Sequence, residues 1–441
     1  MGKTVGLISL GCAKNLVNSE QMLYLLREAG FEISGEPRGA DVVVVNTCGF
    51  IESAKTEAID TILELGALKA EGEIGKIIVA GCLSERYRDE ILEELPEVDA
   101  VVGVGSFAEI VRAAESALRG ERAVFSSEID GGFDDVKRVL TTPGAWAYLK
   151  IADGCDNRCA FCVIPEIRGR FRSRSMESVL AEAEELARGG IRELIVVAQD
   201  ITRYGVDRYG ERRLRDLLLR LCEIDGIKWI RLHYLYPDEM DDGLISVIAD
   251  NKKILKYLDI PIQHINDGIL KKMRRRGSGA ELRALFSKLR AKIPGVVLRT
   301  SLITGLPGEG EAEFDELCDF LREAKLERAG VFPYSPEEGT AAAEMDRPDG
   351  DTARRRAEAV TELQSRVMDE FNEKRVGGRV TALVEWFDGE FYHGRSFAES
   401  PDIDGVIFIR GDDLTLGSFA EVEITGAADG SVLGNAIGEC L

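Results

Sequence analysis

The chain has 441 residues, a formal net charge of −22 and an apolar fraction of 45%. At roughly 100–200 residues per domain, this length predicts two or three domains instead of one core. The negative charge disfavours binding to nucleic acid phosphates unless a basic patch is segregated somewhere, and it favours basic partners.

The nine cysteines favour metal ligation over disulfide bonds. No run of about 18 apolar residues appears, and the opening "MGKTVGLISLGC" is too short and too strand-like for a signal peptide. We therefore expect a soluble, cytoplasmic protein that does not contact a membrane. An odd number of cysteines without an export signal makes a disulfide framework improbable, so metal binding explains the clustered ones better.

Short apolar runs alternate with helical segments over residues 1–125, the predicted first domain. The runs "TVGLISL", "DVVVVNT" and "KIIVAGC" are separated by "SEQMLYLLREAG" and "ESAKTEAIDTILELGALKA". This order predicts an open parallel α/β sheet. Cys12, Cys48 and Cys82 each lie at or just past a strand end. Because the carboxyl ends of parallel strands share one edge, we expect these three thiols to converge there.

A polar, glycine-rich stretch predicts a linker over residues 126–143, and the alternation of strands and helices then resumes over residues 144–372. Six strand and helix units are too many for a small open sheet and too few for an eight-fold barrel. They predict a partial (β/α)6 barrel with its active groups at the strand carboxyl ends. The predicted strands are "AWAYLKIADGC", "RELIVVAQD", "WIRLHYL", "YLDIPIQ", "VVLRTSLITGLPG" and "ERAGVFPYS".

Residues 373–441 lose the helical periodicity and contain short β-rich runs such as "RVTALVEWF", "GVIFIR" and "FAEVEIT". Glycine and aspartate turns between them predict a small antiparallel β-barrel, similar in size to oligonucleotide-binding barrels. From Val376 onward, however, the sequence contains twelve acidic residues and only three arginines. This excess of acids argues against a nucleic acid reader.

The stretch "DGCDNRCAFC" places Cys155, Cys159 and Cys162 in one loop, directly after the first strand of the predicted barrel. Thiolates are soft ligands that suit zinc or iron–sulfur clusters, and closed structural sites normally have four protein ligands. Three cysteines therefore indicate a metal with one open position. A zinc site or a coincidence is the alternative for this loop, and buried free thiols are the alternative for the three cysteines of the first domain.

The pattern Cys155-x-x-x-Cys159-x-Phe161-Cys162 resembles the signature of the radical S-adenosylmethionine (SAM) superfamily. The segments "GCAKN", "NTCGFIESA", "GCLSER" and "CVIPEIRGRFRSRS", in this order, resemble its methylthiotransferase branch over essentially the whole chain. The resemblance implies that these three cysteines hold a 4Fe-4S cluster. Its open iron would chelate SAM, which electron transfer cleaves to a 5′-deoxyadenosyl radical.

The same resemblance implies a second 4Fe-4S cluster on Cys12, Cys48 and Cys82, which binds or relays the inserted sulfur. One SAM molecule would methylate this sulfur, and another would yield the radical. No side chain is expected to act as acid or base, because an unactivated carbon–hydrogen bond offers no acidic proton. An external electron donor is also implied.

Further SAM contacts follow from the resemblance. Phe161 would pack near the adenine, Gln199 would contact the methionine amino group, and Arg299 would pair with the carboxylate. Gly305 and Gly308 match a glycine-rich strand end against which the adenosine lies, although a plain turn is an equal alternative.

Several other chemistry-bearing residues receive no defined role. Four arginines occupy every second position, and they could equally well line a solvent-exposed edge or contact the substrate: Arg168, Arg170, Arg172 and Arg174. Core or surface roles are expected for the three histidines, which lack ligand spacing: His233, His264 and His393. Packing or no function is expected for Cys222, Cys318 and Cys440.

The C-terminal barrel resembles the substrate-binding module called TRAM, which should be basic when it binds tRNA. Its acidity instead favours a basic protein, by electrostatic attraction. With "GRSFAESPDIDGVIFIRG", the resemblance points to the enzymes that insert a methylthio group at the β-carbon of an aspartate in small-subunit ribosomal protein S-twelve. The alternatives are a tRNA adenosine methylthiotransferase, with tRNA the less expected substrate, and a non-catalytic two-cluster electron carrier.

Overall fold

The computed structural model describes residues 2–129 and 136–440, so six residues of the predicted linker lie outside the described residues. Among the described residues, no helix is long and apolar enough to cross a membrane. The chain divides into two compact units. The first contains Met1–Thr141, Lys150–Ser178 and Ser335–Ala343, and the second contains Thr142–Leu149, Val179–Tyr334 and Glu344–Leu441.

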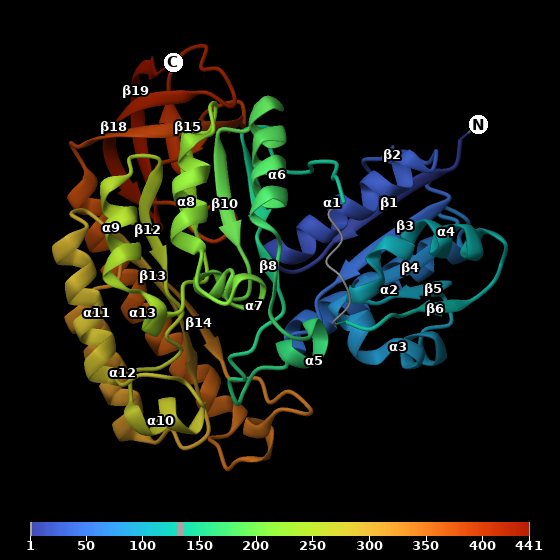
Figure 1. Cartoon of the computed structure of the whole chain (residues 1–441), viewed down its shortest axis with the longest axis horizontal. Coiled ribbons are helices and arrows are strands. Elements are labelled where there is room, and N and C mark those ends of the chain that lie inside the picture. Colours follow the sequence, from blue (N-terminus) through green and yellow to red (C-terminus); the bar gives the residue numbers. More distant parts are fainter. Residues whose placement is uncertain (1, 130–135, 441) are drawn as a thin grey trace. The chain divides into compact units, whose positions relative to one another are not determined.

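The first unit is built on a six-stranded sheet of order β2-β1-β3-β4-β5-β6, in which every pair is parallel (Figure 1). The open parallel sheet predicted from the sequence is therefore confirmed. The strands are β1 (Thr4–Ser9), β2 (Glu32–Ser34), β3 (Val42–Thr47), β4 (Lys76–Gly81), β5 (Ala100–Val102) and β6 (Ala123–Phe125). The helices are α1 (Ala13–Glu28), α2 (Glu52–Ala70), α3 (Cys82–Glu94) and α4 (Ile110–Leu118).

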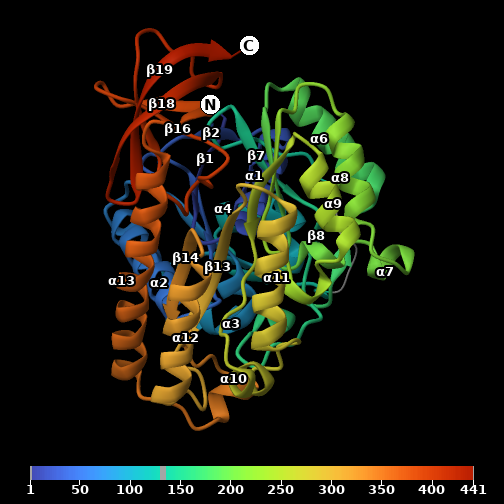
Figure 2. The same cartoon turned by 90° about the vertical axis from the view of Figure 1, so that its left-hand side faces the viewer.

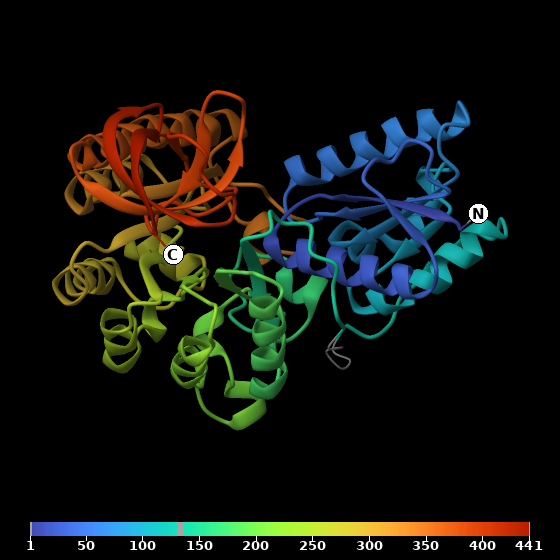
Figure 3. The same cartoon turned by 90° about the horizontal axis from the view of Figure 1, so that it is seen from above.

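Helices cover both faces of this sheet (Figure 3). Successive side chains of a strand point to opposite faces. Val42 and Val44 of β3 therefore pack with α1 and α4, while Val43 and Val45 pack with α2 and α3. Burial on both faces explains why β3 reads as a continuous apolar run instead of an alternating one.

The second unit contains a six-stranded sheet of order β14-β13-β12-β11-β10-β7, with helices on its outside (Figure 2). The pairs from β10 to β14 are parallel, and the predicted partial barrel is confirmed. The strands are β7 (Trp146–Lys150), β10 (Glu193–Val197), β11 (Trp229–Leu232), β12 (Ile254–Asp259), β13 (Val297–Thr304) and β14 (Arg328–Pro333). The helices are α6 (Met176–Arg188), α7 (Val206–Tyr209), α8 (Leu214–Glu223), α9 (Asp242–Asp250), α10 (Asp267–Lys272), α11 (Gly279–Lys292), α12 (Glu311–Ala324) and α13 (Gly350–Arg375).

The C-terminal strands close into a five-stranded barrel of order β15-β16-β17-β19-β18 (Figure 3). All of its neighbouring strands are antiparallel except β17 and β19, which pair in parallel. Inward-facing residues such as Val384, Ile409 and Val422 fill the interior. The strands are β15 (Arg379–Phe387), β16 (Tyr392–Arg395), β17 (Ile407–Arg410), β18 (Phe419–Ala428) and β19 (Ser431–Cys440).

Buried ion pairs join this small barrel to the larger one within the second unit. Glu193 of β10 accepts hydrogen bonds from Arg231 of β11 at 2.7 Å and from Arg395 of β16 at 2.8 Å. All three side chains are at most 1% exposed. Arg231 also donates to the backbone of residues 396 and 397, which follow β16. The C-terminal module thus satisfies charges that the barrel strands bury.

Glu399, in the segment after β16, belongs to the same junction. Its ion pairs with Arg328 and Arg375 are expected to weaken in acid. Its burial raises the carboxyl pKa, but the guanidinium groups of Arg375 and Arg328 overcome burial and lower the pKa from 4.5 to about 2. A depressed folded-state pKa contributes stability above pH 4.5 that is lost as the pH falls toward 2.

We therefore expect the unfolding temperature of the wild type to exceed that of Glu399→Gln above pH 4.5. The difference should shrink as the pH falls toward 2. Thermal unfolding of both proteins across this range measures the effect, and a difference that stays constant with pH would contradict it.

Candidate metal centre

Cys12, Cys48 and Cys82 follow β1, β3 and β4, which are neighbours in the first sheet. Two glycines let their loops approach. Gly11 has φ +97°, and a Cβ there would lie 2.9 Å from the Cβ of Cys48. Gly81 has φ +96°, and a Cβ there would overlap the end of β3. Both positions need glycine for conformation and for space.

The three thiols share one electrostatic environment. Burial raises the pKa of Cys48 to about 12, and the neighbouring Cys82 adds to the rise. Burial likewise raises the pKa of Cys82, with Arg168 acting against it. For Cys12 the balance reverses: burial raises the thiol pKa, but the charges of Lys14 and Arg168 together with backbone hydrogen bonds outweigh it and lower the pKa. The thiols are therefore close enough to interact, and cations favour their ionised forms.

Cys155, Cys159 and Cys162 lie half-buried in one loop of the first unit. The loop leaves β8 (Ala152–Asp153), which pairs with β9 (Arg172–Ser173), and it leads into α5 (Ile164–Arg168). Backbone bonds shape the loop: Cys155 N donates to Gly169 O at 3.2 Å, and Cys162 N donates to Cys159 O at 3.1 Å. The loop is therefore held by bonds between residues close in sequence.

A second segment, Ser335–Ala343, fastens this loop to the N-terminal sheet. Ala342 N donates to Ala160 O at 2.9 Å, and Ala160 lies in the loop between Cys159 and Cys162. Buried Glu337 pairs with Arg86 at 2.6 Å and with Lys55 at 3.2 Å. No local pattern in the sequence marks this segment, because the partners of Glu337 are more than 250 positions away.

Within residues 2–129 and 136–440, no group of three or more His, Cys, Asp or Glu side chains is arranged to hold a single metal ion. A four-iron cluster separates its thiolates more widely than one ion does. The donor set fits such a cluster, since each site offers three soft thiols, of which Cys82 is buried and the others are half-buried.

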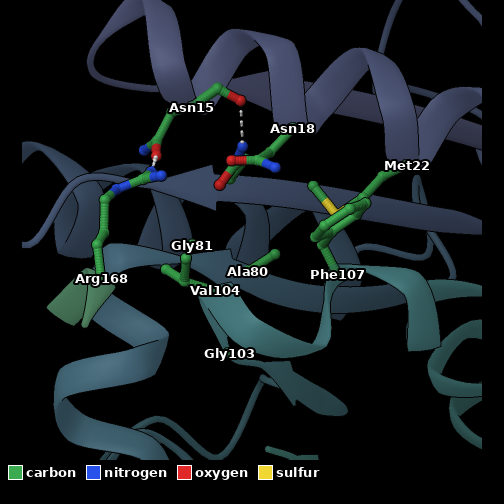
Figure 4. A pocket seen from close by; sticks show the side chains of 10 residues that line it. Asn15, Asn18, Met22, Ala80, Gly81, Gly103, Val104, Phe107 and Arg168 are labelled. Carbon is green, nitrogen blue, oxygen red and sulfur yellow. Dashed lines mark hydrogen bonds between the residues drawn. The ribbon is translucent and has the colours of Figure 1, made fainter. Parts of the chain in front are cut away.

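Arg168 is the residue that the structure adds to this centre (Figure 4). Its side chain is 1% exposed, and it reaches from the end of α5 to Asn15 on α1. It also donates to both carboxylate oxygens of Asp153 at 3.0 Å, and to the Cys82 sulfur at 3.5 Å. The sequence offered a solvated edge or a substrate contact for this arginine, and the first alternative is wrong.

The other three alternating arginines differ from one another. Arg174 is also buried and donates to Lys150 O and Ser178 Oγ, so the solvated edge is wrong for it as well. Arg172 is half-buried and Arg170 is exposed. The alternation in sequence therefore does not correspond to one solvent-facing edge.

The predicted SAM contacts stay predictions. Phe161 lies in the first unit, and the other four residues lie in the second. Arg299 is already paired with Asp259 at 2.8 Å. Gly305 has φ +75°, and a Cβ there would overlap Ala353 of α13, so helix packing by itself requires glycine at this position.

The core or surface roles expected for the histidines, and the packing or lack of function expected for the other cysteines, stay predictions. All three histidines are buried, and each contacts a neighbouring residue: His233 meets Ser400, His264 accepts from Asn266 N, and His393 stacks on Trp386. Cys222 is half-buried and Cys318 is buried. The side chain of Cys440 lies outside the described residues.

Three family models match successive parts of the chain. The uncharacterized protein family UPF0004 matches residues 4–103, the radical SAM superfamily matches residues 149–321, and the TRAM domain matches residues 376–437. These ranges contain the N-terminal cysteines, the cysteine loop and the small β-barrel, respectively.

Full-length relatives decide the family. The chain is 48% identical to the ribosomal protein uS12 methylthiotransferase RimO of Acetivibrio thermocellus, over 100% of this chain and 99% of the relative. It is 49% identical to the RimO protein of Pelotomaculum thermopropionicum, over 99% of this chain and 100% of the relative. The chain belongs to the RimO family of methylthiotransferases.

Solved structures agree with this fold. The radical SAM methyltransferase TsrM from Kitasatospora setae matches with a TM-score of 0.56 at 15% identity, covering 78% of this chain and 77% of TsrM. The cobalamin-dependent radical enzyme OxsB matches with a TM-score of 0.51 at 14% identity, covering 82% of this chain and 56% of OxsB. At these identities the likeness concerns the fold alone.

As a RimO family member, the chain is a sulfur-inserting transferase of the radical SAM class. It uses SAM and 4Fe-4S clusters, so the predicted enzyme class and cofactors are confirmed. The electron-carrier alternative is not favoured.

Proposed function

We propose that this chain inserts a methylthio group at the β-carbon of an aspartate in ribosomal protein uS12. The observation that carries the proposal is the full-length match to RimO proteins together with two sets of three cysteines in one compact unit. The reaction takes place in the cytoplasm, where ribosomal proteins are, and it needs an external electron donor.

Six cysteines hold the cofactors in this proposal. Cys155, Cys159 and Cys162 bind the cluster that takes SAM. The other three, on the N-terminal sheet, bind the second cluster: Cys12, Cys48 and Cys82. When bound, these groups supply hydrogen-atom abstraction from an unactivated carbon and the sulfur that replaces the hydrogen. No side chain of the protein acts as acid or base in the proposal, because such a carbon has no acidic proton.

The protein contributes position and shielding from water. The loops that carry the N-terminal cysteines are packed so closely that a Cβ on Gly49 would lie 2.8 Å from the backbone of Leu83. In the second unit, Glu309 accepts a hydrogen bond from Gly305 N at 2.9 Å and pairs with Arg356, which fixes the glycine turn after β13. Rigid loops keep reacting groups in one geometry.

The surface of the C-terminal barrel supports a basic protein substrate. Three of its twelve acids do not contribute to that surface, because Glu385, Glu399 and Asp404 have side chains at most 8% exposed and lie against arginines of the barrel junction. The exposed acids still outnumber the exposed arginines, Arg379 and Arg410. These acids are Asp388, Glu390, Asp402, Asp412, Asp413 and Asp429. Such a surface attracts cations and repels tRNA phosphates.

A direct assay distinguishes the two substrates. The reconstituted enzyme is incubated anaerobically with SAM, a reductant and a sulfide source, together with either uS12 or tRNA. Mass spectrometry should find the methylthio adduct on an aspartate of uS12 and none on tRNA. An adduct on tRNA adenosine, with uS12 unmodified, would replace this proposal by the tRNA alternative.

A further inference from the structure

We infer that Arg168 is a positioning residue for the N-terminal cluster, whose guanidinium binds the sulfur of Cys82 and makes the cluster easier to reduce. The inference rests on the proposed ligand role of Cys82 and adds a residue that is not itself a ligand. It also assigns a function to an arginine that the sequence left open.

The geometry comes from three neighbouring elements of the first unit. Nη2 of Arg168 lies 3.5 Å from the Cys82 sulfur, and the same nitrogen donates to Asn15 Oδ1. Nη1 donates to both oxygens of Asp153 at 3.0 Å. Cys82 is 4% exposed and Arg168 is 1% exposed. Every contact of this guanidinium is therefore removed from solvent, where electrostatic interactions are strong.

A second buried cation lies beside the carboxylate of Asp153. Asp153 also accepts from Lys150 Nζ at 3.1 Å, and Lys150 is 2% exposed. One carboxylate thus faces two buried cations. Because Lys150 neutralises Asp153 in part, the charge of Arg168 remains available to Cys82. Lys14 adds positive charge near Cys12 of the same site.

A cluster held by three thiolates gains negative charge when it accepts an electron. Hydrogen bonds to the sulfur atoms and nearby positive charge stabilise that reduced form, and both raise the reduction potential. A planar guanidinium can bond a sulfur, an amide oxygen and a carboxylate at once, which a lysine ammonium on a flexible stem cannot reproduce. The contact of Arg168 with Cys82 therefore predicts a higher reduction potential for the N-terminal cluster than it would have without this arginine.

The surrounding cavity supports a fixed position for the guanidinium (Figure 4). It is lined by polar side chains of α1 and β3, including Asn15, Asn18 and Asn46, and by backbone at Gly81 and Gly103. Asn46 Nδ2 donates to Asn15 O at 2.8 Å, so Asn15 is itself held in place. Asp153 lies two residues before Cys155. Arg168 therefore connects the loops of both cysteine sets, through Asp153 on one side and through Asn15 and Cys82 on the other.

The test measures a potential. In the full-length chain carrying Cys155→Ala, Cys159→Ala and Cys162→Ala, only the N-terminal site can hold a cluster. Arg168→Met is added to this background, and the midpoint potential is measured by anaerobic redox titration followed by electron paramagnetic resonance. We expect a shift to more negative potential with iron content retained. Arg170→Met is the matched control, because it removes the same charge from an exposed position two residues away, and its midpoint should not shift.

An unchanged midpoint in a folded, fully loaded Arg168→Met protein would overturn the inference. Loss of iron from folded Arg168→Met, with Arg170→Met fully loaded, would support it, because retention uses the same contact. If Arg168→Met does not fold, Arg168→Lys decides: a smaller negative shift supports the role, and no shift overturns it. A background protein without any cluster would instead refute the proposed ligands.

Discussion

Replacing Cys12, Cys48 and Cys82 with alanine is expected to remove half of the iron and sulfide from each chain. The variant should still cleave SAM, because Cys155, Cys159 and Cys162 lie in a different loop, which backbone hydrogen bonds to Gly169 and Ala342 help to shape. Formation of the methylthio product should fall below detection, since the remaining cluster takes SAM at its open iron in this proposal and no site is left for the sulfur.

Iron and sulfide analysis, 5′-deoxyadenosine release and mass spectrometry of the substrate measure the three parts of this result. A matched control replaces Cys222 and Cys318, which lie in α8 and α12, and should keep the full iron content. Iron content that is equal in the triple variant and the wild type would show that the N-terminal cysteines hold no cluster.

Replacing Glu193 with glutamine is expected to destabilise the second unit by roughly 3–5 kcal/mol. The neutral side chain would leave Arg231 and Arg395 buried without their shared carboxylate. Removing one partner of a buried ion pair costs more than the pair contributes, because the remaining charge has lost its solvation.

Denaturant unfolding of the wild type and of Glu193→Gln measures this loss. Glu362→Gln is the control, because Glu362 pairs with Arg366 on the exposed side of α13 and should have no measurable effect on stability. Equal stability of Glu193→Gln and the wild type would mean that burial of Arg231 and Arg395 does not require the negative charge of Glu193.

The same junction determines how the C-terminal barrel can be tested for substrate binding. Deleting residues 376–441 would remove some hydrogen-bond partners of Arg231 and Arg328, which are buried on the larger barrel. Loss of substrate binding by such a protein would reflect a damaged barrel as readily as a missing surface. Substitution of exposed acids, such as Asp412 and Asp413, separates the two causes.

Features that depend on residues close together in the sequence can be predicted without the structure. Short apolar runs alternating with helical segments predicted the parallel sheet and the partial barrel, and β-rich runs between turns predicted the small barrel, because the sequence of each segment reflects its own burial. The spacing of Cys155, Cys159 and Cys162 predicted a metal loop for the same reason. The short strands β2, β5 and β6 were missed, because three residues carry too little periodicity to be recognised.

Contacts between distant residues depended on the fold. Asn15 and Arg168 are 153 positions apart, and Glu193 and Arg395 are 202 positions apart, so no local pattern connects them. A buried charge is stable only when a partner reaches it, and that partner can lie anywhere in the chain. The proposed cysteine ligands could therefore be named from the linear order of residues, whereas the contact of Arg168 with the Cys82 sulfur depends on the tertiary structure.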